Sequence, residues 1–310
     1  MAGVTELCSA RVKYLSVLFF ISVGLIWTSV SSAEAVAQTL DRVAATKMVH
    51  IGYIADQAPF AWLGADGVPT GYAIDLCTRV VQKIAQTAPG LTTGYVQTSI
   101  ADGLRGIETG RIDLLCGAIT ITLGRRETVD FSQPIFMTGA AALLRRDSPR
   151  DLRELFFGKH EISPPRSPSL HPFALSRVGV RAGTTTETVL RRAVTDGKYS
   201  TTVVGFTSHA EGIAALESRD IDAYFADRAL LIELLGHAQD PSALIVGTRL
   251  FTREAYGIAM RRGDSSLRLL VDRVLSEAFT VPEFGTLLRK YFGAEATDLQ
   301  AQIKGQSLPE

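Results

Sequence analysis

The segment DLLCGAITITLGRRETVDFSQPIF, residues 113–136, decides the fold of this chain. It opens with an apolar run, Leu114–Cys116, and continues through a threonine-rich loop to the pair Arg125 and Arg126. This order predicts a buried strand that ends at a polar site, with a guanidinium just beyond its end. Open α/β sheets bind ligands at the carboxyl ends of their strands, so the segment predicts a ligand site in an α/β fold.

The rest of the chain alternates predicted strands and helices, which is typical of mainly parallel α/β sheets. Strands are predicted at residues 49–53, 113–116, 178–180, 202–204, 222–226 and 255–260. Apolar residues at helical spacing predict helices at 74–87, from about 186, and at 210–218, 265–277 and 282–291. A further strand-to-helix passage is predicted at about 96–108, and residues 297–310 form a polar tail.

Five ordered blocks resemble the extracytoplasmic solute-binding proteins of family 3, the amino-acid receptors of bacterial ABC transporters. They are residues 113–136, GYAIDL (71–76), VGVRAGTTTE (178–187), IDAYFADR (221–228) and EAYGIAMRRGD (254–264). The resemblance covers about residues 49–292. It implies a periplasmic-binding-protein type 2 fold, in which two α/β lobes are joined by a two-stranded hinge. Lobe 1 is expected at 38–134 and 257–310, lobe 2 at 140–251, and the hinge at 135–139 and 252–256.

The resemblance implies that an amino acid is held by its charged groups. Arg125 matches the arginine that binds the α-carboxylate, with Ala118 and Thr120 beside it. Asp227 resembles the aspartate that binds the ammonium, and Thr185 lies in a loop that donates backbone N–H groups. This assignment agrees with chemistry, because a guanidinium suits a carboxylate and a carboxylate suits an ammonium.

Each of these residues also has a purely structural interpretation. Arg125 could be a surface arginine beside Arg126, and Asp227 could cap the helix that follows it. Thr184 and Glu187 form a capping-box pattern, which is compatible with a ligand-binding loop because helix N-termini attract carboxylates.

Three further residues match positions that contact the ligand side chain in relatives: Asp56, Arg181 and His209. A carboxylate at Asp56 would repel an acidic side chain, so we expect a polar amino acid that the sequence does not name. The alternative for His209 is a structural histidine. Three aromatic residues near Asp56 could form a wall of the site or belong to the core: Tyr53, Phe60 and Trp62.

Residues 1–37 have the pattern of a signal peptide. Arg11 and Lys13 precede an apolar run at 15–30, and small residues follow it. A retained anchor is the alternative. Export to the periplasm is therefore expected, and Cys77 and Cys116 are then the cysteines of the mature chain. They could form a disulfide between a helix and a neighbouring strand, or remain two buried thiols.

Residues 156–176 form a proline-rich insertion in lobe 2, with four prolines between Pro164 and Pro172. Proline disfavours helix, so a surface loop is expected. The loop could contact a partner or could be a tolerated insertion.

The balance of 32 basic and 32 acidic residues argues against nucleic acid as a partner. Neither a cofactor nor a metal site is implied. We therefore expect a monomeric periplasmic receptor that delivers an amino acid to the membrane permease of an ABC transporter, and no enzymatic activity. The alternative is an exported enzyme of the same fold, similar to cyclohexadienyl or arogenate dehydratases, with Glu187 or His209 as the acid.

Overall fold

The computed structural model describes residues 38–157, 176–305 and 307–309. The predicted signal peptide and most of the proline-rich insertion lie outside these residues. The described strands form two five-stranded sheets, one three-stranded sheet and one two-stranded sheet.

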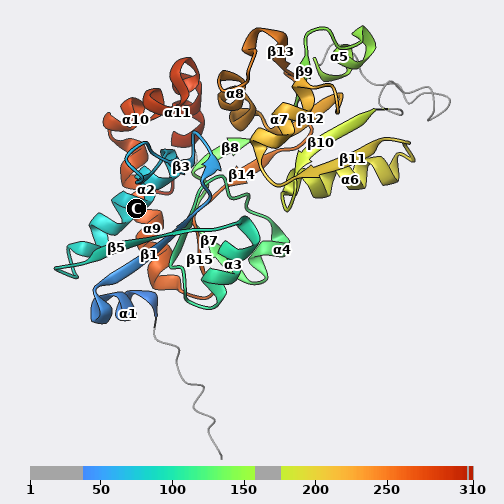
Figure 1. The fold of residues 1–310 in the computed structure, drawn as a ribbon. Coiled ribbons are helices and arrows are strands. Elements are labelled where there is room, and N and C mark those ends of the chain that lie inside the picture. The colour runs from blue at the N-terminus through green and yellow to red at the C-terminus, as the bar shows by residue number, and fades with distance from the viewer. Residues whose placement is uncertain (1–37, 158–175, 306, 310) are drawn as a thin grey trace, which may run out of the picture. The chain divides into compact units, whose positions relative to one another are not determined.

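The first sheet has the strand order β5-β1-β6-β15-β7 and combines two separate parts of the chain (Figure 1). In that order its strands are Thr92–Gln97, Met48–Tyr53, Leu114–Cys116, Ala259–Arg261 and Val129–Phe131. Strand β1 is parallel to β5 and β6, whereas β15 is antiparallel to β6 and β7. The carboxyl ends of β1 and β6 therefore meet at one edge of the sheet.

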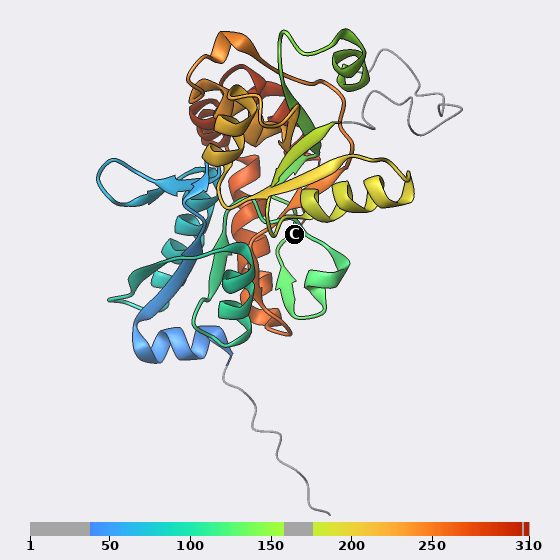
Figure 2. The ribbon, with the colours of Figure 1, turned by 45° about the vertical axis from the view of Figure 1, so that its right-hand side comes forward.

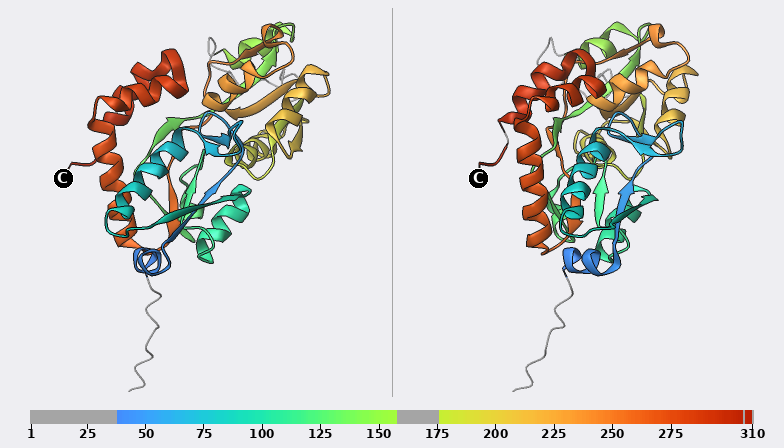
Figure 3. Two further views of the ribbon diagram at one scale, coloured as in Figure 1. Left: turned by 60° about the vertical axis from the view of Figure 1, so that its left-hand side comes forward. Right: turned by 90° about the vertical axis from the view of Figure 1, so that its left-hand side faces the viewer.

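Helices cover both faces of the first sheet, which explains the apolar run in β6. Leu114 and Cys116 lie in a core with α2 (Tyr72–Ala85) and α9 (Ser265–Thr280). Leu115, which points to the opposite face, lies in a second core with α3 (Ile100–Glu108). The remaining helices associated with this sheet are α1 (Thr39–Thr46), α4 (Leu123–Arg126), α10 (Glu283–Phe292) and α11 (Ala296–Lys304); Figure 3 shows α9–α11 in orange to red.

The second sheet has the strand order β11-β10-β12-β9-β13. In that order its strands are Thr202–Phe206, Arg177–Arg181, Ala223–Asp227, Ala140–Arg145 and Leu244–Val246. Strands β10, β11 and β12 are parallel, and β9 is antiparallel to both of its neighbours. Its helices are α5 (Arg150–Phe156), α6 (Thr185–Asp196), α7 (His209–Glu217) and α8 (Arg228–Gly236).

Two antiparallel strands, β8 (Phe136–Thr138) and β14 (Glu254–Tyr256), connect the two large sheets. The chain leaves the first sheet after β7, forms the second sheet, and returns through β14 to β15. The single strand predicted at 255–260 is therefore wrong. The chain changes partners after Tyr256, from β8 to β6 and β7, and the Ser132 hydroxyl accepts a hydrogen bond from Ile258 N at 3.0 Å between the two strands.

Several elements were not expected from the sequence. A small sheet of β2 (Asp56–Gln57), β3 (Ala61–Leu63) and β4 (Pro69–Thr70) follows β1 and is drawn in light blue in Figure 2. The C-terminal tail, expected to be only polar, contains helix α11, because Leu299 and Ile303 are spaced by four residues and both are buried. Among the described helices, none has the length and apolar character that crossing a membrane requires.

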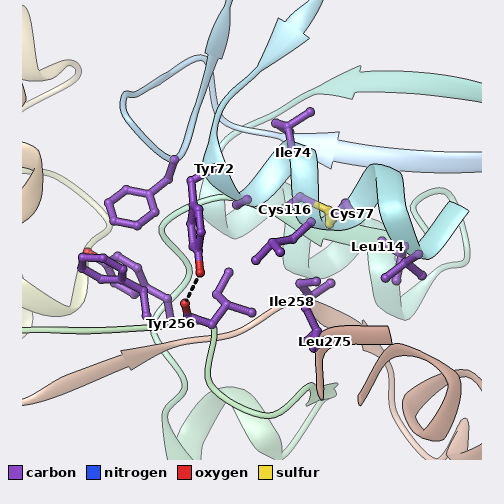
Figure 4. Close-up of a cluster of buried hydrophobic side chains, with 14 of the residues drawn as sticks. Tyr72, Ile74, Cys77, Leu114, Cys116, Tyr256, Ile258 and Leu275 are labelled. Atoms are coloured by element: carbon purple, nitrogen blue, oxygen red, sulfur yellow. Dashed lines mark hydrogen bonds between the residues drawn. A yellow bond between two sulfur atoms is a disulfide. The ribbon is translucent and has the colours of Figure 1, made fainter. Parts of the chain in front are cut away.

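Cys77 of α2 and Cys116 of β6 are joined by a disulfide in the structure, with the Cα atoms 6.6 Å apart. Figure 4 shows it inside the first core, near Leu114 and Ile258. In the same view Tyr72 donates a hydrogen bond of 2.7 Å to the carbonyl oxygen of Ile135, just before the connecting strand β8. The disulfide therefore links a helix and a strand of the core that supports the loop after β6.

We expect loss of the disulfide to destabilise the protein strongly. The bridge spans 39 residues, and the chain-entropy relation gives about 4 kcal/mol for a loop of that length. The double variant Cys77→Ala/Cys116→Ala should therefore unfold at lower denaturant concentration than the oxidised wild type. Addition of a reductant should shift the wild type in the same direction and leave the variant unchanged. Equal unfolding midpoints for the oxidised wild type and the double variant would contradict the bridge.

Candidate functional site

The loop after β6 places Arg125 at the carboxyl end of the first sheet. Thr122 is the N-cap of helix α4, and its hydroxyl oxygen accepts a hydrogen bond from Arg125 N at 3.1 Å. The Arg125 side chain then turns back toward the loop, where Nη1 donates to the carbonyl oxygen of Thr120 at 2.7 Å. The capped turn and this side-chain bond together fix the position of the guanidinium.

Arg125 carries a buried charge that lies near carboxylates without forming an ion pair with any of them in the described part of the chain. Burial lowers the pKa of Arg125 from its ordinary value, and the carboxylates of Glu254 and Asp227 oppose that shift. Within the described part of the chain, no carboxylate forms a salt bridge with Arg125. A planar guanidinium in this setting can bind a carboxylate through two parallel hydrogen bonds.

Asp227 supplies a negative charge from the second sheet. It is the last residue of β12, and its side chain is only 7 % exposed. Tyr256 of the connecting strand β14 donates a hydrogen bond to Oδ2, whereas Oδ1 is buried and has no partner in the structure. Although Asp227 stands at the N-cap position of α8, its side chain makes no capping bond, so the structural interpretation as a helix cap is wrong.

The environment of Asp227 is unfavourable for an isolated negative charge. Burial raises the pKa of Asp227 to about 7, and the nearby Glu254 carboxylate adds to the shift. The Tyr256 hydroxyl and the Arg125 charge act in the opposite direction. A cation that reached Oδ1 would favour the ionised form and satisfy the free oxygen.

Two threonine hydroxyls from opposite sides of the site meet at one carboxylate. Glu254 of β14 accepts hydrogen bonds on Oε2 from Thr120 at 2.8 Å and from Thr185 at 2.9 Å. Its other oxygen, Oε1, accepts from the Thr252 hydroxyl at 2.7 Å. The two threonine oxygens of the site are 3.3 Å apart. The loop after β6 and the start of α6 are therefore in contact.

Thr120, Arg125, Thr185 and Asp227 line one small cavity of about 20 Å³, whereas Glu254 and Tyr256 do not. Its walls come from both large sheets and their loops: Gln57, Ile100, Ala118, Thr120, Arg125, Arg181, Thr184, Thr185, Thr186, His209, Phe225, Ala226, Asp227 and Leu230. A space of that size holds roughly one water molecule. An amino acid therefore enters only if the two walls move apart.

Arg181, which lines this cavity, forms an ion pair with Asp56, which does not. Arg181 Nη2 lies 2.9 Å from Asp56 Oδ1, while Asp56 Oδ2 and Arg181 Nε are buried without a partner. Beside them, Ala118 N donates to Gln57 Oε1 at 2.9 Å. The structure thus brings Asp56 and Arg181 together, and the charge expected to repel an acidic ligand is opposed by a guanidinium.

His209 is buried at the start of α7, where it is only 3 % exposed. Its Nδ1 lies 2.9 Å from the Tyr224 hydroxyl. Burial, followed by the positive charge of Arg181, lowers the pKa of His209 to about 3. The imidazole is therefore neutral at physiological pH and contributes a hydrogen-bonding group and no charge to the cavity.

The sequence profile of the bacterial extracellular solute-binding proteins, family 3, matches residues 49–294. This chain belongs to that family. The L-glutamate/L-aspartate-binding protein of Pseudomonas aeruginosa is 27 % identical over 264 residues, which are 84 % of this chain and 82 % of the relative. The ABC transporter glutamine-binding protein GlnH of Bacillus subtilis is 22 % identical and covers 84 % of this chain and 87 % of its own length.

The fold of this solute-binding protein is similar to that of solved amino-acid-binding proteins. The ancestral amino acid-binding protein AncCDT-1, described as a precursor of cyclohexadienyl dehydratase, has a TM-score of 0.66. It is 24 % identical, and the match covers 83 % of this chain and 100 % of that protein. At this level of identity the likeness establishes the fold alone.

Sequence reasoning missed three site residues of this family member. Glu254 and Tyr256 belong to the EAYGIAM block, but the sequence assigns them only to the expected hinge at 252–256; Gln57 lies beside the predicted Asp56. A glutamate in an otherwise apolar strand was the available signal, because buried carboxylates usually have a partner or a function. Tyr256 had no such signal, since buried tyrosines are common.

The structure decides between the alternatives that the sequence leaves open for three aromatic residues and for Glu187. Tyr53, Phe60 and Trp62 do not line the cavity; Tyr53 and Phe60 are buried in the first core, and Trp62 packs against it. The Thr184 hydroxyl caps α6 as predicted, because it accepts from Glu187 N at 3.2 Å. The Glu187 carboxylate accepts from Gly183 N at 2.8 Å, one residue before the N-cap N–H that a full capping box uses. Among the described residues, no cluster of His, Cys, Asp and Glu could hold a metal ion.

Proposed function

We propose that this protein is a periplasmic receptor that captures a free amino acid between its two sheets and delivers it to the permease of an ABC transporter. The observation that carries the proposal is the pair of unpaired opposite charges, Arg125 and Asp227, on facing walls of one cavity. This arrangement suits the carboxylate and the ammonium of an α-amino acid. The names of the relatives, which bind glutamate, aspartate and glutamine, support the same ligand class.

The two ends of the ligand would be held by different elements. The carboxylate would bind Arg125 and the start of α6, where the backbone N–H groups of the first turn have no partner within the helix. The ammonium would bind Asp227 Oδ1. The ligand therefore joins the first sheet to the second.

We propose a polar side chain for the ligand, read by Asp56, Arg181 and His209. The ion pair of Asp56 and Arg181 offers one buried acceptor and one buried donor that lack partners. A side chain with both a donor and an acceptor matches this pair. The positive charge of Arg181 offsets the negative charge of Asp56. An acidic side chain on the ligand is therefore repelled less than it would be by Asp56 alone.

Capture would occur by hinge closure between lobe 1 (residues 38–134 and 257–310) and lobe 2 (residues 140–251). The connecting segments, 135–139 and 252–256, contain the strand pair β8 and β14. A ligand that contacts both lobes stabilises the closed form by its differential affinity, and a permease can then recognise that form. We propose that the protein acts as a monomer after export and cleavage within residues 1–37.

We further propose that the protein is not an enzyme. Of the two candidate acids, Glu187 is engaged in the cap of α6. His209, with its pKa lowered to about 3, holds no proton to donate near neutral pH. Asp227, by contrast, has a pKa of about 7 and could donate a proton near neutral pH. The dehydratase alternative therefore requires a test.

We expect one or a few of the twenty L-amino acids to raise the melting temperature of the mature protein. The protein is refolded first so that carried-over ligand is removed. A ligand in excess of its dissociation constant stabilises the folded state by mass action, by about 2.7 kcal/mol at a hundredfold excess. Absence of any shift, together with consumption of added prephenate or arogenate over time, would contradict the receptor and favour the enzyme.

A further inference from the structure

Glu254 is a buried carboxylate beside the small cavity of the site. It lies on β14 and is 6 % exposed; it does not line the cavity that contains Arg125 and Asp227, but it lines an adjoining open hollow together with Thr120, Arg125 and Thr185. No basic side chain of the described residues forms a salt bridge with it. Its hydrogen-bond partners are three threonine hydroxyls, of which two, Thr120 and Thr185, do line the cavity.

The hydrogen bonds to Glu254 use the hydroxyl protons of both threonines. A carboxylate only accepts hydrogen bonds, so both hydroxyls must donate to Glu254 Oε2. Each hydroxyl has one proton, and each oxygen therefore keeps only lone pairs for other partners. The 3.3 Å contact between Thr120 Oγ1 and Thr185 Oγ1 is then a contact between two acceptors.

We propose that Glu254 is a positioning residue that makes Thr120 and Thr185 into acceptors for the ligand ammonium. This inference rests on the proposed amino-acid receptor function. The two threonine oxygens and the free Oδ1 of Asp227 form a set of three acceptors on the cavity wall. An ammonium has three N–H donors, which matches this set.

The same orientation discourages a carboxylate at the two threonine hydroxyls, whereas the backbone N–H groups at the start of α6 remain available as donors. A carboxylate needs donors, and the threonine protons already point to Glu254. Thr120 is expected from the family pattern to lie beside the carboxylate-binding Arg125, but its hydroxyl oxygen, whose proton points to Glu254, suits the ammonium instead. Glu254 thereby sets which end of the amino acid lies at each side of the cavity.

The test compares two variants of Glu254 with the wild type. The probes are the twenty L-amino acids and, for those that bind, the carboxylic acid that lacks the α-amino group, each titrated by calorimetry. Glu254→Leu removes the acceptor, whereas Glu254→Gln keeps one acceptor oxygen. We expect Glu254→Leu to weaken amino-acid binding by about tenfold to a hundredfold, the range for hydrogen bonds to charged groups. Binding of the deaminated acid should change little, and Glu254→Gln should lose less.

An unchanged ratio between the amino acid and its deaminated acid in both variants would overturn the role of Glu254. If Glu254→Leu does not fold, a double-mutant cycle of Thr185→Val and Glu254→Gln decides the question. Effects on amino-acid affinity that are not additive support the proposal, and additive effects overturn it. A wild type that binds no amino acid at all marks a failure of the proposed receptor function and removes the basis for the role of Glu254.

Discussion

Asp227→Asn is expected to weaken amino-acid binding strongly. Asparagine keeps the shape of the side chain and can still accept the hydrogen bond from Tyr256, but it removes the negative charge that would face the ligand ammonium. Removing one partner of a buried charge pair costs about 2–5 kcal/mol, which corresponds to roughly 30-fold to several thousandfold in affinity. Calorimetric titration of the wild type and the variant measures this loss.

The same residue should make binding dependent on pH. The pKa of Asp227 is raised to about 7 in the structure, and the ammonium prefers the ionised carboxylate. Below pH 7 the proton must leave before the ligand binds, so the affinity of the wild type should fall about tenfold per pH unit. The remaining affinity of Asp227→Asn should lack this dependence.

Asp227→Asn should also stabilise the protein without ligand at high pH. A carboxyl whose pKa rises from 3.8 to about 7 on folding favours the folded state most below its unfolded pKa, and it loses this contribution as pH rises through 7. The difference between these two pKa values corresponds to roughly 4 kcal/mol of folding free energy. Asparagine does not titrate, so the melting temperature of the variant should exceed that of the wild type more at pH 8 than at pH 4.

The matched control is Asp196→Asn, which neutralises an exposed carboxylate on α6 that pairs with Arg192. This variant should bind as the wild type does and show no pH-dependent gain in stability. If Asp227→Asn retained wild-type affinity, Asp227 would not face the ammonium. If its melting temperature differed from the wild type equally at pH 4 and pH 8, the raised pKa would be wrong.

Arg125→Met is expected to produce the second large loss of affinity. The substitution removes the guanidinium that has no carboxylate partner among the described residues, and with it the proposed partner of the ligand carboxylate. We expect a loss of the same order, about 2–5 kcal/mol in binding. Arg125→Lys should recover only part of it, because lysine keeps the charge but lacks the planar pair of donors.

Arg126→Met is the control for this experiment, because Arg126 is the next residue and is exposed to solvent. It should leave affinity unchanged. Equal losses in the Arg125 and Arg126 variants would indicate a general electrostatic effect on the ligand. An unchanged affinity in Arg125→Met would instead remove Arg125 from the site.

The ends of strands were the part of the site that sequence could predict. Arg125 follows β6 and Asp227 ends β12, and in both cases an apolar run stops at a polar residue. Since neighbouring parallel strands end at one edge of a sheet, such residues collect there. Of the strands in the two large sheets, β1, β6, β10, β11 and β12 are predicted in this way, whereas β7, β9 and β13 are not.

Contacts between the two sheets were not predictable in this way. Asp56 and Arg181 were each expected to face a ligand, but their mutual ion pair depends on how the sheets are placed. Glu254 acts through hydroxyls that come from both sides of the cavity, and no local pattern contains that arrangement. The connection at Gly257 was missed for a similar reason, because strand pairing changes there while the apolar pattern continues.

The most direct test is a crystal structure of the mature protein with the amino acid that stabilises it most. The account predicts the α-carboxylate on the Arg125 guanidinium near the start of α6, and the ammonium on Asp227 Oδ1 and the threonine oxygens. A ligand bound elsewhere, or bound with its ammonium and carboxylate exchanged, would contradict it.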